Sequence, residues 1–201
     1  MEEFTSNGQE YSGKVAAFAD NSGSTRKKLA LHACCAPCSS YTLEYLSPEY
    51  DIELYFYNPN IMPEDEYLKR LSELKRLTGN FENVNLTVGE YDTERFLSLT
   101  KGFEDEPEGG ARCEICIRHR LEETARFAAK IKASCFSTTL TISPHKNAEF
   151  INFTQAELEK TIGVKSLSLN LKKKNGYLRS IELSKKYNLY RQKYCGCLFN
   201  K

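Results

Sequence analysis

Seven of the eight cysteines lie in three short clusters that are far apart along the chain. The first is His-Ala-Cys-Cys-Ala-Pro-Cys at residues 32–38, the second is Cys113 with Cys116, and the third is Cys195 with Cys197. Thiols at such close spacing are typical ligands of soft metal ions and of iron–sulfur clusters. The chain therefore needs a fold that brings three distant segments to one point.

The number of thiols limits the kind of site. A structural zinc site takes four ligands, and a [4Fe–4S] cluster takes four thiolates. Seven clustered thiols exceed either need and favour an iron–sulfur cluster with a second metal or with redox-active thiols, while zinc and a pure thiol–disulfide system stay open. The adjacent Cys34 and Cys35 share one metal only on an irregular loop; otherwise they serve two metals, or one of them is packed. Cys135 stands alone in a predicted strand, and we interpret it as a small residue of the core.

The composition indicates where these thiols work. The chain is 40% hydrophobic and 27% charged, has no run of about 18 apolar residues that could span a bilayer, and starts without the apolar core of a secretion signal. We expect a cytoplasmic protein without a membrane partner. Thiols stay reduced there, which favours metal binding over disulfides.

Strand and helix patterns alternate along residues 27–201, which predicts a single α/β domain after an N-terminal extension at 1–26. Apolar or β-branched runs predict five strands, at 27–33, 51–57, 83–88, 134–140 and 164–169. Helical spacing predicts the helices between and after them, at 39–46, 64–77, 93–100, 113–132, 147–161 and 178–187. The alternation favours a mostly parallel sheet with helices on both faces.

In such sheets ligands bind beyond the carboxyl ends of the strands. The polar stretches 34–38, 58–63 and 141–147 each follow a predicted strand, so we expect them to form one site that includes the cysteine loops. The glycine-rich loops that bind ATP or NAD are absent from the sequence. Dependence on either nucleotide is unsupported.

Positive charge gathers near the C-terminus, although the net charge of the chain is only +1. From residue 171 onward nine Lys and Arg face one acid, an excess of +8. Lys172, Lys173, Lys174, Arg179 and Arg191 are candidate contacts to RNA phosphates, with tyrosines nearby that could stack on unpaired bases. An ordinary solvated surface explains the three lysines equally well.

These residues together resemble the QueH family of epoxyqueuosine reductases. The matching stretches are H-A-C-C-A-P-C (32–38), Y-N-P-N-I-M-P-E-D-E-Y-L-K-R (57–70), R-C-E-I-C (112–116), R-L-E-E-T-A (120–125), F-S-T-T-L-T-I-S-P-H-K-N (136–147) and R-S-I-E-L-S-K-K-Y-N-L-Y-R-Q-K-Y-C-G-C (179–197). The resemblance implies a Rossmann-like fold of the HUP type. It also implies reduction of the epoxide of epoxyqueuosine at the tRNA wobble position, with electrons from an external donor.

The resemblance further implies a [4Fe–4S] cluster with an additional mononuclear iron. Carried over by position, the metal ligands are Cys34, Cys35, Cys113, Cys116, Cys195 and Cys197. Cys38 stands where some members have Asp, and we take it as a catalytic candidate. His32 and Tyr57 are candidates for the acid that helps the oxygen leave as water. A structural role as a buried core histidine explains His32 equally well.

Two other functions compete with this interpretation. An iron–sulfur enzyme that thiolates tRNA would share the fold class and the cluster, but it predicts a pyrophosphate loop that the sequence lacks. A zinc-stapled RNA-binding module predicts one closed zinc site and leaves three clustered thiols without a role.

Overall fold

The computed structural model of the chain describes residues 25–199, apart from the side chain of Lys174. Its centre is a five-stranded sheet in the order β3-β2-β1-β4-β5, and all pairings are parallel. The strands are β1 (Lys27–His32), β2 (Tyr50–Phe56), β3 (Val84–Val88), β4 (Cys135–Thr138) and β5 (Lys165–Ser166). The predicted α/β class with a parallel sheet is confirmed. Most of the predicted extension lies outside the described residues.

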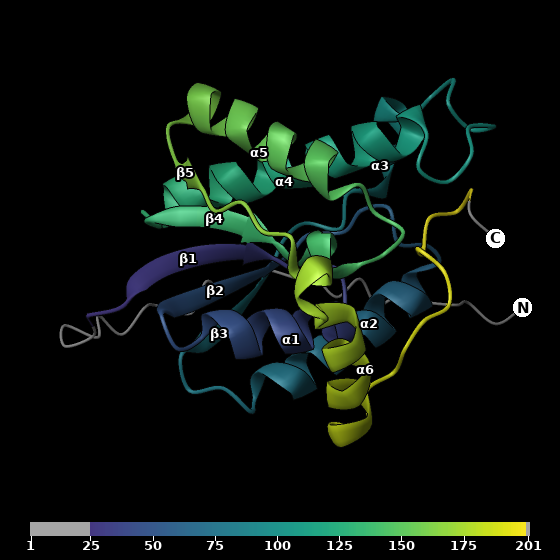
Figure 1. Cartoon of the computed structure of the whole chain (residues 1–201). Helices are drawn as coiled ribbons and strands as arrows, with labels where there is room; N and C mark the ends of the chain where they lie inside the picture. Colours follow the sequence, from purple (N-terminus) through teal and green to yellow (C-terminus); the bar gives the residue numbers. More distant parts are fainter. Residues whose placement is uncertain (1–24, 200–201) are drawn as a thin grey trace, which may run out of the picture.

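Helices cover both faces of the sheet (Figure 1). One layer contains α1 (Ala36–Leu46), α2 (Glu64–Thr78) and α6 (Gly176–Lys186), and the other contains α3 (Thr93–Leu99), α4 (Ala111–Lys130) and α5 (Ala148–Ile162). Successive side chains of a strand point to opposite faces, so Leu29 and Leu31 pack with the first layer while Ala30 packs with the second. This explains why the central strands read as continuous apolar runs.

The ends of several elements differ from the prediction. The first helix starts at Ala36 rather than residue 39, because Pro37 is compatible with the first helical turn. The fourth strand stops at Thr138 and turns into a 3-10 helix, η1 (Thr139–Ile142). The fifth strand is only two residues long. Beyond it, the Ser137 hydroxyl donates to the carbonyl of Leu167, and Asn152 of α5 bonds the amide and the carbonyl of Leu169. A second 3-10 helix, η2 (Leu171–Lys174), precedes α6.

The segment after α6 returns along α2 to the carboxyl end of the sheet. Arg76 of α2 donates to the carbonyls of Tyr187 and Asn188, and Glu73 accepts from the amide of Tyr190. Farther along, the buried Arg70 donates to the carbonyls of Tyr194 and Cys195. One face of α2 therefore holds the segment that carries Cys195 and Cys197.

Within residues 25–199, no helix is both long and apolar enough to cross a membrane.

Candidate active site

The first cysteine cluster forms the turn between β1 and α1. Cys35 precedes the first helical residue with an extended backbone, φ −170° and ψ 163°, so this turn is irregular. As a result, the sulfur atoms of Cys34 and Cys35 lie 3.7 Å apart, and those of Cys34, Cys35 and Cys38 all lie within 4.8 Å of one another. Tetrahedral bonds of about 2.3 Å to a metal put its sulfur ligands about 3.8 Å apart. The triad thus suits a single metal ion.

The three thiols share negative charge unequally. Hydrogen bonds from Cys35 and Cys38 lower the pKa of Cys34 well below its ordinary value, and Thr139 adds to this effect. The same hydrogen bonds raise the pKa of Cys38, and they raise that of Cys35 to about 12. One thiolate therefore forms easily in the triad, and further ionisation requires a cation such as a metal.

The other four clustered cysteines surround a second, smaller cavity. Cys113 and Cys116 come from the first two turns of α4, and Cys195 and Cys197 come from the C-terminal segment. Burial raises the pKa of Cys116 to about 11, and the other three thiols contribute to the shift. Four cysteines are the donor set of a [4Fe–4S] cluster and also of structural zinc.

The spacing of the sulfurs separates the two groups. Between residues 25 and 199, only the triad has three His, Cys, Asp or Glu ligand atoms within 4.8 Å of one another. The sulfurs around the smaller cavity are therefore more widely spaced than the triad. A multinuclear cluster needs more widely spaced ligands than one ion does, so this wider spacing distinguishes the four cysteines from the triad.

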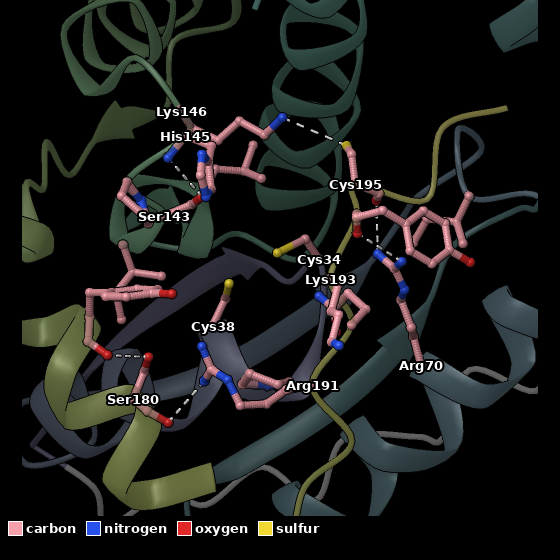
Figure 2. Close-up of a pocket in the computed structure, with 18 of the residues that line it drawn as sticks. Cys34, Cys38, Arg70, Ser143, His145, Lys146, Ser180, Arg191, Lys193 and Cys195 are labelled. Atoms are coloured by element: carbon pink, nitrogen blue, oxygen red, sulfur yellow. Dashed lines mark hydrogen bonds between the residues drawn. The ribbon is translucent and has the colours of Figure 1, made fainter. Parts of the chain in front are cut away.

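Both thiol groups open onto one larger cavity of about 580 Å³. Cys34 and Cys38 line it from one side and Cys195 from another, and Figure 2 shows these three side chains projecting into it from different elements. Cys195, Arg120 and Lys146 line both cavities. The cysteine loops therefore meet at the carboxyl end of the sheet, as predicted.

Several cations that the sequence did not single out surround these thiols. Arg120 is buried and donates to the carbonyl of Cys116 and to Asn58. Lys146 lies 3.6 Å from the sulfur of Cys195 and 3.1 Å from a carboxylate oxygen of Glu108. Burial alone would lower the pKa of Lys146, but the Cys195 thiol and Glu108 raise it overall. Positive charge therefore lies beside these thiols, where it stabilises their thiolate forms.

The proposed acid His32 is fully buried beneath the triad. Its Nδ1 lies 3.0 Å from Thr138 Oγ1 and its Nε2 lies 3.1 Å from the carbonyl of Tyr57. Burial lowers its pKa to about 4, with Arg120 adding to the shift. Both ring nitrogens therefore have partners within the sheet, and His32 is not among the residues that line the larger cavity.

Tyr57 is likewise not among the residues that line the larger cavity, and the contact of its hydroxyl is with α4. The hydroxyl lies 2.8 Å from Nε2 of His119 on α4, and burial raises its pKa. Of the three catalytic candidates, only Cys38 lines the larger cavity.

The five basic residues proposed for RNA contact are in different environments. Arg191 lines the larger cavity and donates to Ser180 and Ser184 of α6. Lys172 donates to the carbonyl of Lys146, and Lys173 is exposed. Arg179 pairs with Glu44 and Glu182, and the side chain of Lys174 is outside the described part. The structure adds Lys193, His145 and Tyr194 to the cavity wall.

Fold and site together define a class: an α/β protein of the parallel-sheet type, with thiols that could hold metal at the carboxyl ends of its strands. The family model described as "Epoxyqueuosine reductase QueH" matches residues 29–201. Similar proteins of that name come from Streptococcus pyogenes serotype M1, with 43% identity over 88% of this chain and 71% of the relative, and from Staphylococcus epidermidis, with 43% identity over 87% and 76%. Another, from Thermotoga maritima, is 40% identical over 85% of this chain and 88% of the relative. The chain belongs to the QueH family.

Proposed function

We propose that this protein reduces the epoxide of epoxyqueuosine in tRNA, in the cytoplasm, with an iron–sulfur site. The observation that carries the proposal is the meeting of two thiol groups at one basic cavity. A cavity of about 580 Å³ falls in the size range of small-molecule sites. It can therefore take an unpaired nucleobase, and the family relationship supplies the reaction.

In this proposal the four cysteines around the smaller cavity, Cys113, Cys116, Cys195 and Cys197, hold the [4Fe–4S] cluster. Cys34 and Cys35 hold the mononuclear iron at the cavity wall. When bound, these groups would pass electrons from an external donor and polarise the epoxide oxygen. Arg120 and Lys146 lie between the two groups and offset their negative charge.

Removing the epoxide oxygen consumes two electrons and two protons, and it leaves a carbon–carbon double bond and water. The protons must come from groups on the cavity wall. Of the catalytic candidates, Cys38 is the one that lines this wall, and Lys146 is a cation on the same wall. These two residues are the proposed donors to the departing oxygen.

His32 and Tyr57 act as positioning residues in this scheme. His32 joins the ends of β1, β2 and β4 through Thr138 and the Tyr57 carbonyl, which places the Cys34 loop. The Tyr57 hydroxyl joins β2 to His119, one turn after Cys116 on α4. Both residues thereby fix the relative positions of the two thiol groups.

The tRNA would enter over the basic side of the cavity. Arg191 and Lys193 line it beside the exposed rings of Tyr177 and Tyr194, and cations with aromatic rings suit the phosphates and splayed bases of a single-stranded loop. Lys172 and Lys173 of η2 and Arg179 of α6 extend this surface, and Lys174 is a further proposed contact on the basis of the sequence alone. Binding is then expected to weaken with salt, by about 0.7 decade per decade of salt for each phosphate contact.

The test is anaerobic purification with iron and sulfide analysis, followed by incubation with tRNA that carries epoxyqueuosine and a strong chemical reductant. Nucleoside mass spectrometry should show conversion to queuosine. Zinc in place of iron, or an unchanged nucleoside at full iron content, would contradict the proposal. Product that carries added sulfur would instead support a thiolation enzyme.

A further inference from the structure

We propose that Asn60 recognises the hydrogen-bonding edge of the nucleobase in the cavity, an inference that rests on the proposed function. Asn60 lines the larger cavity and is 1% exposed. Neither its amide nitrogen nor its amide oxygen has a hydrogen-bond partner among residues 25–199. The side-chain oxygen of Gln192, which lines the same cavity, is also buried without a partner in the described part of the chain.

A buried amide without partners is costly. Each unsatisfied polar group lowers the stability of the fold, whereas an apolar side chain of similar shape in that place is nearly neutral or stabilising. Asn58, two residues earlier, shows what a structural amide looks like in the same loop. It donates to the carbonyl of Ala33 at 2.8 Å and accepts from Arg120 at 3.3 Å. The side chain of Asn60 makes no such bond to any residue that the structure describes.

The loop that carries Asn60 is held on both sides. Tyr91 donates to the carbonyl of Ile61 at 2.7 Å, and the amide of Met62 donates to Gly196 at 2.9 Å. The backbone is thus fixed at residues 58, 61 and 62, which limits how far the buried amide of Asn60 can move to find another partner. It is therefore held ready for a ligand, as recognition groups with low reorganisation cost are.

The chemistry of a primary amide selects the ligand. Its carbonyl accepts and its NH₂ donates side by side, which matches the adjacent donor and acceptor atoms of a nucleobase edge. A phosphate would suffer repulsion from the amide oxygen and has Arg191 and Lys193 on the same cavity. A soft metal has thiolates in reach, which it prefers over an amide oxygen. The base edge is the remaining partner.

The experiment compares Asn60→Leu with the matched control Asn58→Leu. For Asn60→Leu we expect an unchanged or higher Tm and a fall in kcat/KM of roughly 10- to 100-fold, mainly through KM, because about 1–3 kcal/mol of substrate hydrogen bonding is lost. For Asn58→Leu the Tm itself should fall. The smaller Asn60→Ala provides the same kinetic comparison if leucine does not fit.

A binding measurement tests the role of Asn60 independently of the proposed reaction. Anaerobic affinity is measured for anticodon stem–loop RNA with epoxyqueuosine and for the same RNA with an abasic wobble position. Wild type should prefer the first, and Asn60→Leu should lose that preference even if no turnover occurs. Equal binding of the two RNAs by wild type, or a Tm loss in Asn60→Leu as large as in Asn58→Leu, would overturn the role of Asn60.

Discussion

Replacing Arg70 with methionine should release the last cysteine pair from the site. Arg70 is the only residue of the described chain shown to donate to the backbone of both Tyr194 and Cys195, at 3.3 and 2.8 Å. Its Nε also pairs with Glu66 at 2.7 Å, and the two side chains are 3% and 10% exposed. Methionine fills much of the same volume but donates no hydrogen bond.

The magnitude follows from what the substitution leaves behind. Removing one partner of a buried ion pair costs about 3–5 kcal/mol, because the other charge stays buried without compensation. For a domain of this size each kcal/mol lowers the Tm by about 2–4 °C. We therefore expect Arg70→Met to lower the Tm by roughly 6–20 °C and to reduce the iron bound per chain.

Arg76→Met is the matched control. Arg76 lies on the same helix, pairs with Glu73, and donates to the carbonyls of Tyr187 and Asn188 in the same segment. Its side chain is 48% exposed, so water can replace these bonds and the expected loss is about 1 kcal/mol. Calorimetry and iron analysis of both variants test the argument. Equal Tm values for the two variants, with full iron in Arg70→Met, would refute it.

Three further predictions use other parts of the chain. Gly196→Ala should lower the stability and the bound iron more than Gly102→Ala does. Both glycines have positive φ, but only at Gly196 would a Cβ meet a guanidinium nitrogen of the buried Arg70, at 2.9 Å. Comparison of the Tm and the iron content of the two variants tests this. Cys195→Ser should abolish conversion and lower the bound iron, while Cys135→Ser, in the core away from both thiol groups, should lose only stability; retained conversion in Cys195→Ser would contradict the ligand assignment. Burial raises the pKa of the Glu53 carboxyl, so folding favours its protonated form, and its contribution to stability is lost as the pH rises through the folded-state pKa. Glu53→Gln should therefore have a higher Tm than wild type at pH 7 and lose that advantage near pH 4. A Tm difference that does not change with pH would exclude this cause.

The sequence predicted the sheet well because its signals are local. Apolar runs, turn residues and helical spacing each depend on neighbours along the chain, and the five strands appear in the predicted order. The errors are at element ends. After Ser166 the backbone bonds side chains in place of a neighbouring strand, with Ser137 at Leu167 and Asn152 of α5 at Leu169. No local pattern announces such a long-range substitution.

The site was predicted in part for the same reason. Closely spaced thiols are visible in the sequence, and so are the loops at strand ends. Arg70 was missed because its partners Tyr194 and Cys195 are 124 and 125 positions away, and on α2 it reads as one more charged residue of an exposed face. Its i,i+4 spacing from Glu66 was the available local signal. His32 was ambiguous until its two partners were known.

The way the C-terminal segment is attached links metal binding to folding. Residues 187–199 form no strand or helix and reach the site through side chains of α2 and the bond between Met62 and Gly196. Such attachments have low local stability compared with the sheet. Two of the four thiols around the smaller cavity are on this segment, and the other two are on α4. A group bound by all four would join the segment to the domain, so its binding free energy would add directly to the stability of the docked state.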